Sequence, residues 1–322
     1  MSSGIEYNVI MLSQKIKNKA LELGFLSAGI IPSGTFDEYT RHLDDLIKSF
    51  PESEGLYQAL YDMARQKESA KSIIVCTKRY NKYKVPDKLD GLIGKYYLFD
   101  CRVPYSQEYR EIKEFESFIN LLGINILQGR VPDRLAAAKA GLGKFGRNNF
   151  LYDPKHGSYI YINAWVVDKE LEYDPIENDL LSPECKESCR KCVQSCPTKA
   201  LSNSFFMDRG KCITHLTCFV KNTPDEKIQS QMGRWLYGCD VCQDVCPLNK
   251  GKFTETEEYP LLADFEVYLK PEQIKEMDEE TYKKIINPRF WYAGEENLWL
   301  WKSNAHRSIK NSGEKKPAEE RK

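Results

Sequence analysis

Hydrophobic residues recur at helical spacing in the first part of the chain, and turn-forming residues separate the groups. The spacing predicts a first helix over residues 11–24, which ends at Gly24. Two further helical patterns cover residues 36–50 and 57–69, and Pro51 separates them. The chain is therefore expected to begin with helices that each bury one side.

Short apolar runs alternate with helical patterns as far as residue 168. Runs rich in β-branched and aromatic residues predict strands at residues 25–31, 72–77, 124–127 and 158–167. Helical patterns lie between them at residues 105–122 and 133–140, the second with Pro132 in its first turn. Strands that alternate with helices in this way indicate an α/β or α+β domain.

Two segments of this domain lack regular periodicity. Residues 81–104 are rich in Lys, Tyr, Gly and Pro and predict an irregular loop, a kind of segment that is often functional. This loop contains four side chains that either line a site or only fill space, namely Tyr96, Tyr97, Cys101 and Tyr105. The segment 141–149, Gly-Leu-Gly-Lys-Phe-Gly-Arg-Asn-Asn, has three glycines in six residues. Such a segment either brings the backbone close to another group or makes a tight turn.

The last part of the chain changes in composition. Residues 253–281 are acidic and punctuated by proline. An aromatic group follows at Phe290, Trp291, Tyr292, Trp299 and Trp301. From Asn311 onward the chain is charged and poor in apolar residues, which predicts a disordered tail.

Composition limits the class of protein. The 322 residues are 41% hydrophobic, which allows one large domain and a smaller one. Lys+Arg and Asp+Glu both number 47, so the formal net charge is zero. This balance disfavours a protein whose main task is to bind nucleic acid, although it allows a local basic patch. Residues 1–10 show no export pattern, and no stretch approaches a membrane span, so we expect a cytoplasmic protein without membrane contact.

Cysteines carry the strongest chemical signal. Nine of the eleven fall between Cys185 and Cys246, and two runs end in Cys-Pro. Each [4Fe–4S] cluster needs four thiolates, and in two-cluster ferredoxins the cysteine before proline ligates the other cluster. This crossing over assigns one cluster to Cys185, Cys189, Cys192 and Cys246. The second cluster takes Cys196, Cys212, Cys239 and Cys242, which leaves Cys218 over.

Zinc, disulfides and a core of buried thiols are the alternatives. Zinc favours paired C-x-x-C units, and Cys-Pro does not typically close them. Disulfides need an oxidising compartment, and a buried core does not concentrate cysteines so densely. Three residues separate Cys185 from Cys189 where two are usual, so the loop must accommodate an extra residue there.

Several motifs resemble the epoxyqueuosine reductases. They are AGLGKFGRNNFL at 140–151, Gly157-Ser158 before an apolar strand and Asp168, KCITHLT at 211–217, GCDVCQDVCPLN at 238–249 and NAHRSIKNSG at 304–313. Together they cover about residues 70–312. The related corrinoid-dependent reductive dehalogenases share the same two modules.

The resemblance implies an α+β fold with a nitroreductase-like, corrinoid-binding α/β domain over residues 1–175. A bacterial two-cluster ferredoxin-like module would follow over residues 176–255. A C-terminal helical segment and disordered tail would make up residues 256–322. The implied cofactors are two [4Fe–4S] clusters and a cobalamin, which receives electrons one at a time and does the chemistry that the protein orients.

The resemblance also implies site residues. Arg147, Asn148 and Asn149 would approach the corrin ring from the glycine-rich segment, and Thr214 from the cluster module. Family members carry an acidic proton donor before the glycine-rich segment, and an alignment without gaps places Leu127 there. Asp133, six residues later, is the nearest carboxylate and our candidate catalytic residue, with tyrosines between residues 96 and 109 as alternatives.

The expected function is a cobalamin- and iron–sulfur-dependent reductase similar to epoxyqueuosine reductase. Its substrate would be tRNA carrying the queuosine precursor, or a small molecule reduced by the same cobalt chemistry. A reduced ferredoxin or flavodoxin is the expected electron donor. Two alternatives are intracellular reductive dehalogenation of a small organohalide and electron transfer without a substrate of its own.

Overall fold

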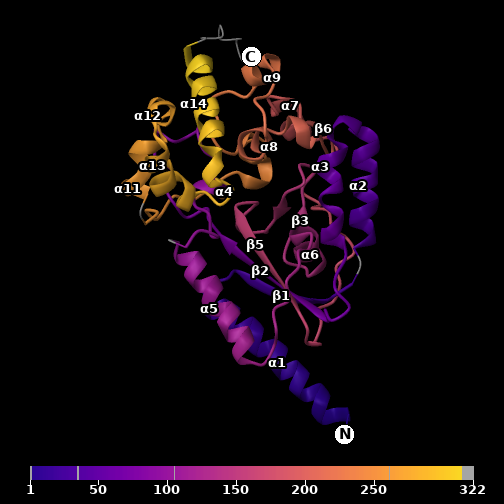
Figure 1. Cartoon of the computed structure of the whole chain (residues 1–322). Helices are drawn as coiled ribbons and strands as arrows, with labels where there is room; N and C mark the ends of the chain where they lie inside the picture. The colour runs from indigo at the N-terminus through magenta and orange to yellow at the C-terminus, as the bar shows by residue number, and fades with distance from the viewer. Residues whose placement is uncertain (1, 35, 105, 261, 314–322) are drawn as a thin grey trace.

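A three-stranded antiparallel sheet lies at the centre of the N-terminal half, in the order β1-β2-β5 (Figure 1). The computed structural model describes residues 2–34, 36–104, 106–260 and 262–313. The strands are β1 (Ser27–Pro32), β2 (Ser72–Arg79) and β5 (Ile160–Val167). Their register places Ile74 between Ile30 and Trp165. An antiparallel sheet with separate helices makes the domain α+β rather than α/β.

The central strand β2 contributes to two hydrophobic clusters, one on each face of the sheet. Ile74 and Cys76 belong to one cluster, and Ile73 and Val75 belong to the other. This is the alternation that a period of two residues requires. All but the last residue of the strand are buried. A strand covered on both faces explains why its sequence is a continuous apolar run.

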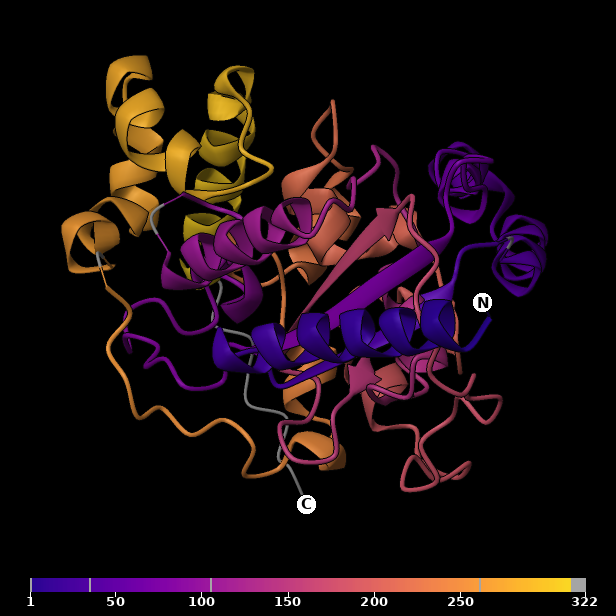
Figure 2. The same cartoon turned by 90° about the horizontal axis from the view of Figure 1, so that it is seen from below.

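Helices cover both faces of the sheet. The helices α1 (Ser2–Glu22) and α5 (Gln107–Leu121) lie over the face of Ile74, where Ile16 and Phe115 are fully buried (Figure 2). The helix α6 (Asp133–Lys139) lies on the other face and buries three consecutive alanines, Ala136 to Ala138. Small side chains on α6 let it approach the sheet closely.

Shorter elements complete this domain. They are α2 (Asp37–Ser49), the 3₁₀ helix η1 (Pro51–Ser53), α3 (Glu54–Gln58), the 3₁₀ helix η2 (Tyr61–Ala64) and α4 (Lys95–Leu98). A two-stranded ribbon of β3 (Lys144–Phe145) and β4 (Leu151–Tyr152) encloses the end of the glycine-rich segment.

The cysteine-rich module follows β5 and packs beside the ribbon (Figure 1). Its elements are α7 (Lys191–Ser195), β6 (Leu201–Asn203), β7 (Phe206–Met207), η3 (Arg209–Lys211), α8 (Ile213–Cys218), α9 (Glu226–Gln231), α10 (Val241–Asp244) and η4 (Pro247–Asn249). The C-terminal segment is helical, with α11 (Leu262–Phe265), η5 (Glu266–Leu269), α12 (Pro271–Glu276), α13 (Glu279–Thr281), the π turn η6 (Tyr282–Ile286), η7 (Asn287–Arg289), η8 (Glu295–Asn297) and α14 (Leu298–Gly313). Among the described helices, none combines the length and apolar character that a membrane crossing requires.

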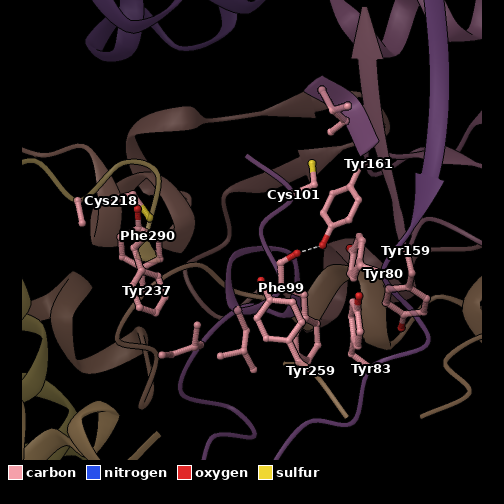
Figure 3. Packing of buried hydrophobic residues seen from close by; sticks show 14 of the residues in the cluster. Tyr80, Tyr83, Phe99, Cys101, Tyr159, Tyr161, Cys218, Tyr237, Tyr259 and Phe290 are labelled. Atoms are coloured by element: carbon pink, nitrogen blue, oxygen red, sulfur yellow. Dashed lines mark hydrogen bonds between the residues drawn. The ribbon is translucent and has the colours of Figure 1, made fainter. Parts of the chain in front are cut away.

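One hydrophobic core joins the sheet to the C-terminal segment. It contains buried tyrosines from distant parts of the chain, among them Tyr80, Tyr161 and Tyr237 (Figure 3). The Tyr161 hydroxyl donates a hydrogen bond to the carbonyl of Phe99. Phe290 belongs to the same core, so the C-terminal segment packs on the first domain through this core.

Most predicted elements are confirmed, and three predictions are wrong. The pattern at residues 57–69 gives only the end of α3 and the 3₁₀ helix η2. A contact of Tyr57 explains why the helix ends early. Its hydroxyl donates to the Met207 carbonyl, 2.6 Å away, and so fixes this segment to the cysteine-rich module. The predicted strand at 124–127 makes a single bridge, between Ile126 and Val167 at the edge of β5 that faces away from β2, and forms no named strand.

The third error concerns the predicted tail. Residues 311–313 belong to α14, where the Asn311 amide donates to the carbonyls of Gln229 and Gly233. These bonds fix the end of the helix to the cysteine-rich module. The rest of the predicted tail, residues 314–322, lies outside the described residues.

Candidate functional site

The eight predicted ligands gather into two groups of thiols. Cys192 lies within electrostatic range of Cys185, Cys189 and Cys246. Cys242 lies within range of Cys196 and Cys212, and Cys239 lies within range of Cys212 and Cys242. These contacts are compatible with the sets that crossing over groups, and Cys192 also lies within electrostatic range of Cys242 in the other set. The assignment of the ligands to two clusters stays a prediction. The donor chemistry of each set, four cysteine thiols, fits a [4Fe–4S] cluster.

The three remaining cysteines are buried in the hydrophobic core. Cys76 lies on strand β2, and Cys101 and Cys218 pack among tyrosines (Figure 3). Among the described residues, no three His, Cys, Asp or Glu side chains converge on a position for one metal ion. The thiolates of a cubane cluster each bind a different iron, so they stand further apart than the ligands of a single ion.

The glycines of the glycine-rich segment make room for Tyr152. A Cβ atom on Gly146 would lie 2.5 Å from Cε2 of Tyr152, and one on Gly143 would lie 2.8 Å from its carbonyl oxygen. Gly141 has a different role, because its φ of +72° ends α6 in the left-handed conformation. The glycine-rich segment therefore ends α6 at Gly141 and then packs closely against Tyr152 through Gly143 and Gly146.

This segment contacts both groups of thiols. The backbone amide of Arg147 donates to Sγ of Cys185 at 3.4 Å. The hydroxyl of Tyr152 hydrogen-bonds with Cys246, which belongs to the same group. The Asn148 amide donates to the carbonyl of Cys242, 2.9 Å away, in the second group. Hydrogen bonds to sulfur stabilise the negative charge of a cluster, whereas the bond from Asn148 to a carbonyl fixes the backbone beside a predicted ligand.

A cleft between the two modules has a cavity volume of about 280 Å³ and opens to solvent. All four thiols of the second group, Cys196, Cys212, Cys239 and Cys242, line it. The other walls come from Tyr96, Tyr97, Arg134, Asn148, Asn149, Phe150, Pro197, Ala200, Leu201, Met207, Ile213, Thr214, Asp240, Val241, Gln243 and Tyr292. A cluster held by the second group would therefore form part of the wall of the cleft.

The predicted cofactor-contacting residues separate into two sets. Asn148, Asn149 and Thr214 line the cleft. Arg147 is not among the lining residues; its guanidinium donates to the Cys185 carbonyl and lies over the ring of Phe205. Arg147 thus contacts the first group of thiols rather than the open space.

Asp133, the candidate catalytic residue, begins α6 beside Arg134, which lines the cleft. The residue is exposed, yet the protein atoms around its carboxyl group raise its pKa to about 6. Arg130, Arg134 and Arg102 oppose this rise. A carboxyl with such a pKa is partly protonated near neutral pH, as a proton donor requires. Leu127, where the resemblance would place an acid, packs instead against the core beneath α6.

A buried ion pair supports the cleft from below. Asp240 accepts hydrogen bonds from the backbone amide and the ammonium group of Lys95, at 2.8 and 3.4 Å. Next to it, the Gln243 amide donates to Ser158 at 3.0 Å, and the Asn249 amide donates to the same hydroxyl at 2.8 Å. These bonds join α4, α10 and the start of β5, so the two modules are fixed relative to each other at the cleft.

Sequence reasoning missed part of the lining. Tyr96 and Tyr97 were candidates and do line the cleft, whereas Cys101 lies in the core and Tyr105 lies outside the described residues. Arg134, Phe150 and Tyr292 were not candidates. Arg134 and Phe150 neighbour predicted residues, which was an available signal. Tyr292 comes from a segment about which the cysteine pattern says nothing.

Comparisons with known proteins agree with this site. Residues 184–249 match the family model of the 4Fe-4S double cluster binding domain, which confirms the expected double-cluster module. The epoxyqueuosine reductase of Cellulophaga algicola is 31% identical over 299 residues, which are 88% of this chain and 95% of that protein. The enzyme of Staphylococcus aureus is 32% identical over 292 residues, 84% of this chain and 71% of that protein.

Solved structures support the fold. A crystal structure of epoxyqueuosine reductase with a tRNA-Tyr epoxyqueuosine-modified stem loop matches with a TM-score of 0.71 at 24% identity, covering 94% of this chain and 81% of that one. The Bacillus subtilis epoxyqueuosine reductase, with its catalytic loop swung out of the active site, matches with the same TM-score and identity, covering 94% and 82%.

Proposed function

This chain belongs to the epoxyqueuosine reductase family, and we propose that it reduces epoxyqueuosine in tRNA to queuosine, using two [4Fe–4S] clusters and a cobalamin. Removal of the epoxide oxygen to leave an alkene consumes two electrons and two protons and releases water. The site must therefore hold an electron path, a place for the reacting group and proton donors.

One observation carries this proposal: the four thiols of the second group line the same cleft as the glycine-rich segment and three tyrosines. A cluster at these thiols would lie directly against whatever the cleft binds. A cluster at the first group of thiols would pass electrons to a cluster at the second group, because Cys192 and Cys242 are within electrostatic range of each other. Electrons would therefore pass from the first group to the second and then into the cleft.

The cleft also suits a large cofactor with amide substituents. Asn148 and Asn149 provide polar atoms on one wall, Thr214 provides a hydroxyl on another, and Tyr96 and Tyr292 provide aromatic surface. Cobalamin, when bound, would supply a strongly reducing cobalt centre for cleavage of the carbon–oxygen bond. The tyrosine and phenylalanine side chains would exclude water from the reacting group.

Protons must come from groups near the cleft that are protonated at neutral pH. Burial raises the pKa of Tyr96 and of Tyr97, so both hydroxyls stay protonated and can donate hydrogen bonds to a developing oxyanion. Asp133, with a pKa of about 6, is the carboxyl group that can recover a proton from solvent between turnovers. We assign the proton supply to Asp133 and the positioning of the oxygen to the tyrosines.

The test is a reduction assay with anaerobically purified protein. Protein loaded with cobalamin is expected to contain about eight irons per chain, as two [4Fe–4S] clusters require. Chemically reduced protein is then incubated with tRNA from a strain that cannot complete queuosine, and the nucleosides are separated by mass spectrometry. Conversion of epoxyqueuosine to queuosine supports the proposal, and the absence of conversion by corrinoid-loaded, reduced protein refutes it.

The electron donor is a separate part of the proposal. A reduced ferredoxin or flavodoxin is the expected partner because the clusters accept one electron at a time. Replacing the chemical reductant by flavodoxin and its reductase should sustain turnover. Retention of chemical but not flavodoxin-driven conversion would reject this donor without rejecting the reaction.

A further inference from the structure

The loop that carries the first group of thiols forms an outer surface of the cysteine-rich module. The four thiols of this group are half-buried. The residues that separate its members along the loop are exposed, namely Lys186, Glu187, Ser188, Arg190 and Lys191. A cluster at this group would therefore lie directly under an exposed loop.

The second group of thiols faces a different space. All four of its members line the cleft in which the cofactor and the substrate of the proposed reaction would lie. A protein that approached from that side would compete with both for the same space. The loop over the first group, in contrast, can be reached by an electron donor while the cleft is filled.

Positive charge predominates on this loop and just after it. Residues 184–199 carry four basic and two acidic side chains, although the formal net charge of the whole chain is zero. The guanidinium of Arg190 donates to Oδ1 of Asn203 at 2.7 Å, and the ammonium group of Lys199 donates to the carbonyl of Gln194 at 2.9 Å. Both acceptors are neutral, so these bonds leave the positive charges uncompensated.

The basic side chains of this segment also lack carboxylate partners. Within the described part of the chain, no ion pair involves any of the four, which are Lys186, Arg190, Lys191 and Lys199. Lys144 on the neighbouring strand β3 differs, because its ammonium group lies 3.7 Å from Glu177 and 2.9 Å from Asp179. Four exposed positive charges therefore remain for a partner beside the first group of thiols.

An exposed apolar side chain lies beside these charges. Leu181 is 43% exposed, although leucine is a type that is usually buried. The turn after it is closed by the amide of Cys185, which donates to the carbonyl of Ser182 at 3.0 Å. Protein interfaces combine an apolar contact with a charged rim, and those for electron transfer are among the smallest.

We propose that this surface, which we call the donor face, docks reduced flavodoxin. It consists of Leu181, Lys186, Arg190, Lys191 and Lys199. The positive charges attract the acidic surface of flavodoxin, and Leu181 contacts the apolar edge of its flavin. Each encounter moves one electron from the flavin to the first group of thiols and its irons, so two encounters supply the two electrons of the proposed reaction. The inference rests on the proposed function and adds to it the place at which electrons enter.

Flavodoxin fits the donor face better than RNA or a ferredoxin does. Phosphates of RNA would also bind the basic side chains, but residues 181–199 contain no aromatic ring on which a base could stack. Glu184 and Glu187 would also repel phosphates. A ferredoxin is acidic as well, but its cluster lies under a polypeptide loop and offers no apolar ring edge to Leu181.

The test measures binding of fluorescently labelled flavodoxin to cluster-loaded protein, at low and at physiological ionic strength. Lys186→Glu and Lys191→Glu are each expected to weaken binding about tenfold at low salt, because charge reversal replaces attraction by repulsion. The loss should shrink as salt screens the charges. Lys191→Arg keeps the charge and should bind flavodoxin as the wild type does.

Reduction of the clusters, followed by their visible absorbance, is the second readout. Flavodoxin-driven reduction should slow in both charge-reversal variants in parallel with binding. Leu181→Ser should slow it too but leave its salt dependence unchanged. Photoreduced deazaflavin is a small uncharged reductant that needs no docking surface, so it should reduce every variant at the wild-type rate.

Lys15→Glu is the matched control. Lys15 is an exposed lysine on α1, away from α7 and the donor face (Figure 1). This variant makes the same change in net charge and should alter neither binding nor reduction. Iron content and circular dichroism of every variant should equal those of the wild type, because the donor-face residues are not predicted ligands.

Three results would overturn the donor face. The first is wild-type binding of flavodoxin by both charge-reversal variants. The second is unchanged flavodoxin binding with loss of RNA-hairpin binding or of ferredoxin-driven reduction, which would assign the surface to another partner. The third is slower reduction by deazaflavin, which would mean that the lysines stabilise a cluster.

The proposed reaction is judged separately, with deazaflavin as the reductant. A wild type that binds flavodoxin through the donor face but does not convert epoxyqueuosine would refute the reaction and leave the donor face standing. Conversion with deazaflavin by charge-reversal variants that still bind flavodoxin normally would refute the donor face and leave the reaction standing.

Discussion

The backbone amide of Arg147 donates a hydrogen bond to Sγ of Cys185, 3.4 Å away. Cys185 is the predicted ligand with the unusual spacing, because three residues separate it from Cys189. An amide that points at this thiol is what a ligated thiolate needs, since it stabilises negative charge on sulfur. The contact therefore supports Cys185 as a ligand and shows that the glycine-rich segment reaches the first group of thiols.

Tyr152→Phe should lower the reduction potential of one cluster. The variant removes the hydroxyl that hydrogen-bonds with Cys246 but keeps the ring that packs on Gly146. A hydrogen bond to sulfur favours the reduced, more negative cluster, so its loss makes reduction harder. A net contribution of about 1 kcal/mol corresponds to a shift on the order of 40 mV for a one-electron couple.

Redox titration followed by electron paramagnetic resonance would measure this shift. Tyr173→Phe is the control, because the hydroxyl of Tyr173 bonds to the Lys71 carbonyl at an exposed position. Two unchanged cluster potentials in Tyr152→Phe would mean that this hydroxyl does not tune a cluster.

Replacing one ligand of the second group should remove one cluster and spare part of the other. In Cys239→Ala or Cys242→Ala, iron content should fall from about eight to about four or fewer per chain, since each cluster holds four irons and the remaining cluster assembles only in part. Cys218→Ala is the control, because Cys218 is buried among tyrosines and is the thiol that the grouping leaves over. A halved iron content in Cys218→Ala would contradict the ligand assignment.

The cysteine chemistry could be predicted from the sequence, but the shape of the cleft could not. Ligand type and Cys-Pro spacing restrict a cluster motif locally, so the two sets of thiols were accessible without coordinates. Strand β2 was equally accessible because a strand buried on both faces is a continuous apolar run. Arg102 and Tyr292, in contrast, meet across 190 residues of sequence, at 2.7 Å, through folding of the C-terminal segment.

Local patterns failed where contacts between modules decide the conformation. The segment after Pro51 has helical spacing, yet the Tyr57 hydroxyl bonds to Met207 and to the amide of Arg209 and the helix ends early. The role of the glycines was also hidden, because only the fold brings Tyr152 against Gly146. Repeated glycines indicate that the backbone approaches another group closely, but they do not identify that group.

Gly146→Ala should destabilise the protein. The added Cβ would lie 2.5 Å from the ring of Tyr152 and 3.0 Å from Oδ1 of Asn148, so these side chains must shift. Overpacking of this kind costs about 1–3 kcal/mol. Gly34→Ala is the matched control, since nothing lies within 4 Å of its added Cβ. Urea unfolding followed by circular dichroism would compare the two variants, and equal midpoints would contradict the close approach.

Asp133→Asn should gain stability relative to the wild type as pH rises. The folded-state pKa of Asp133 is raised to about 6 from the ordinary value of 3.8, because the protein atoms around its carboxyl group disfavour the carboxylate although the residue as a whole is exposed. The folded protein therefore holds this proton more tightly than the unfolded chain does. The wild type loses the corresponding stability as pH rises through about 4 to about 6, whereas asparagine has no proton to lose.

The size of this effect is limited because Asp133 keeps contact with solvent. We expect a relative gain on the order of 1 kcal/mol above the folded-state pKa, discounted for solvent screening. Thermal unfolding of both proteins at about pH 5 and about pH 8 would measure it, with the larger difference at the higher pH. The same variant should lose most of its reductase activity if Asp133 supplies the proton. A variant that reduces epoxyqueuosine at the wild-type rate while showing the stability gain would assign the proton to the tyrosines of the cleft instead.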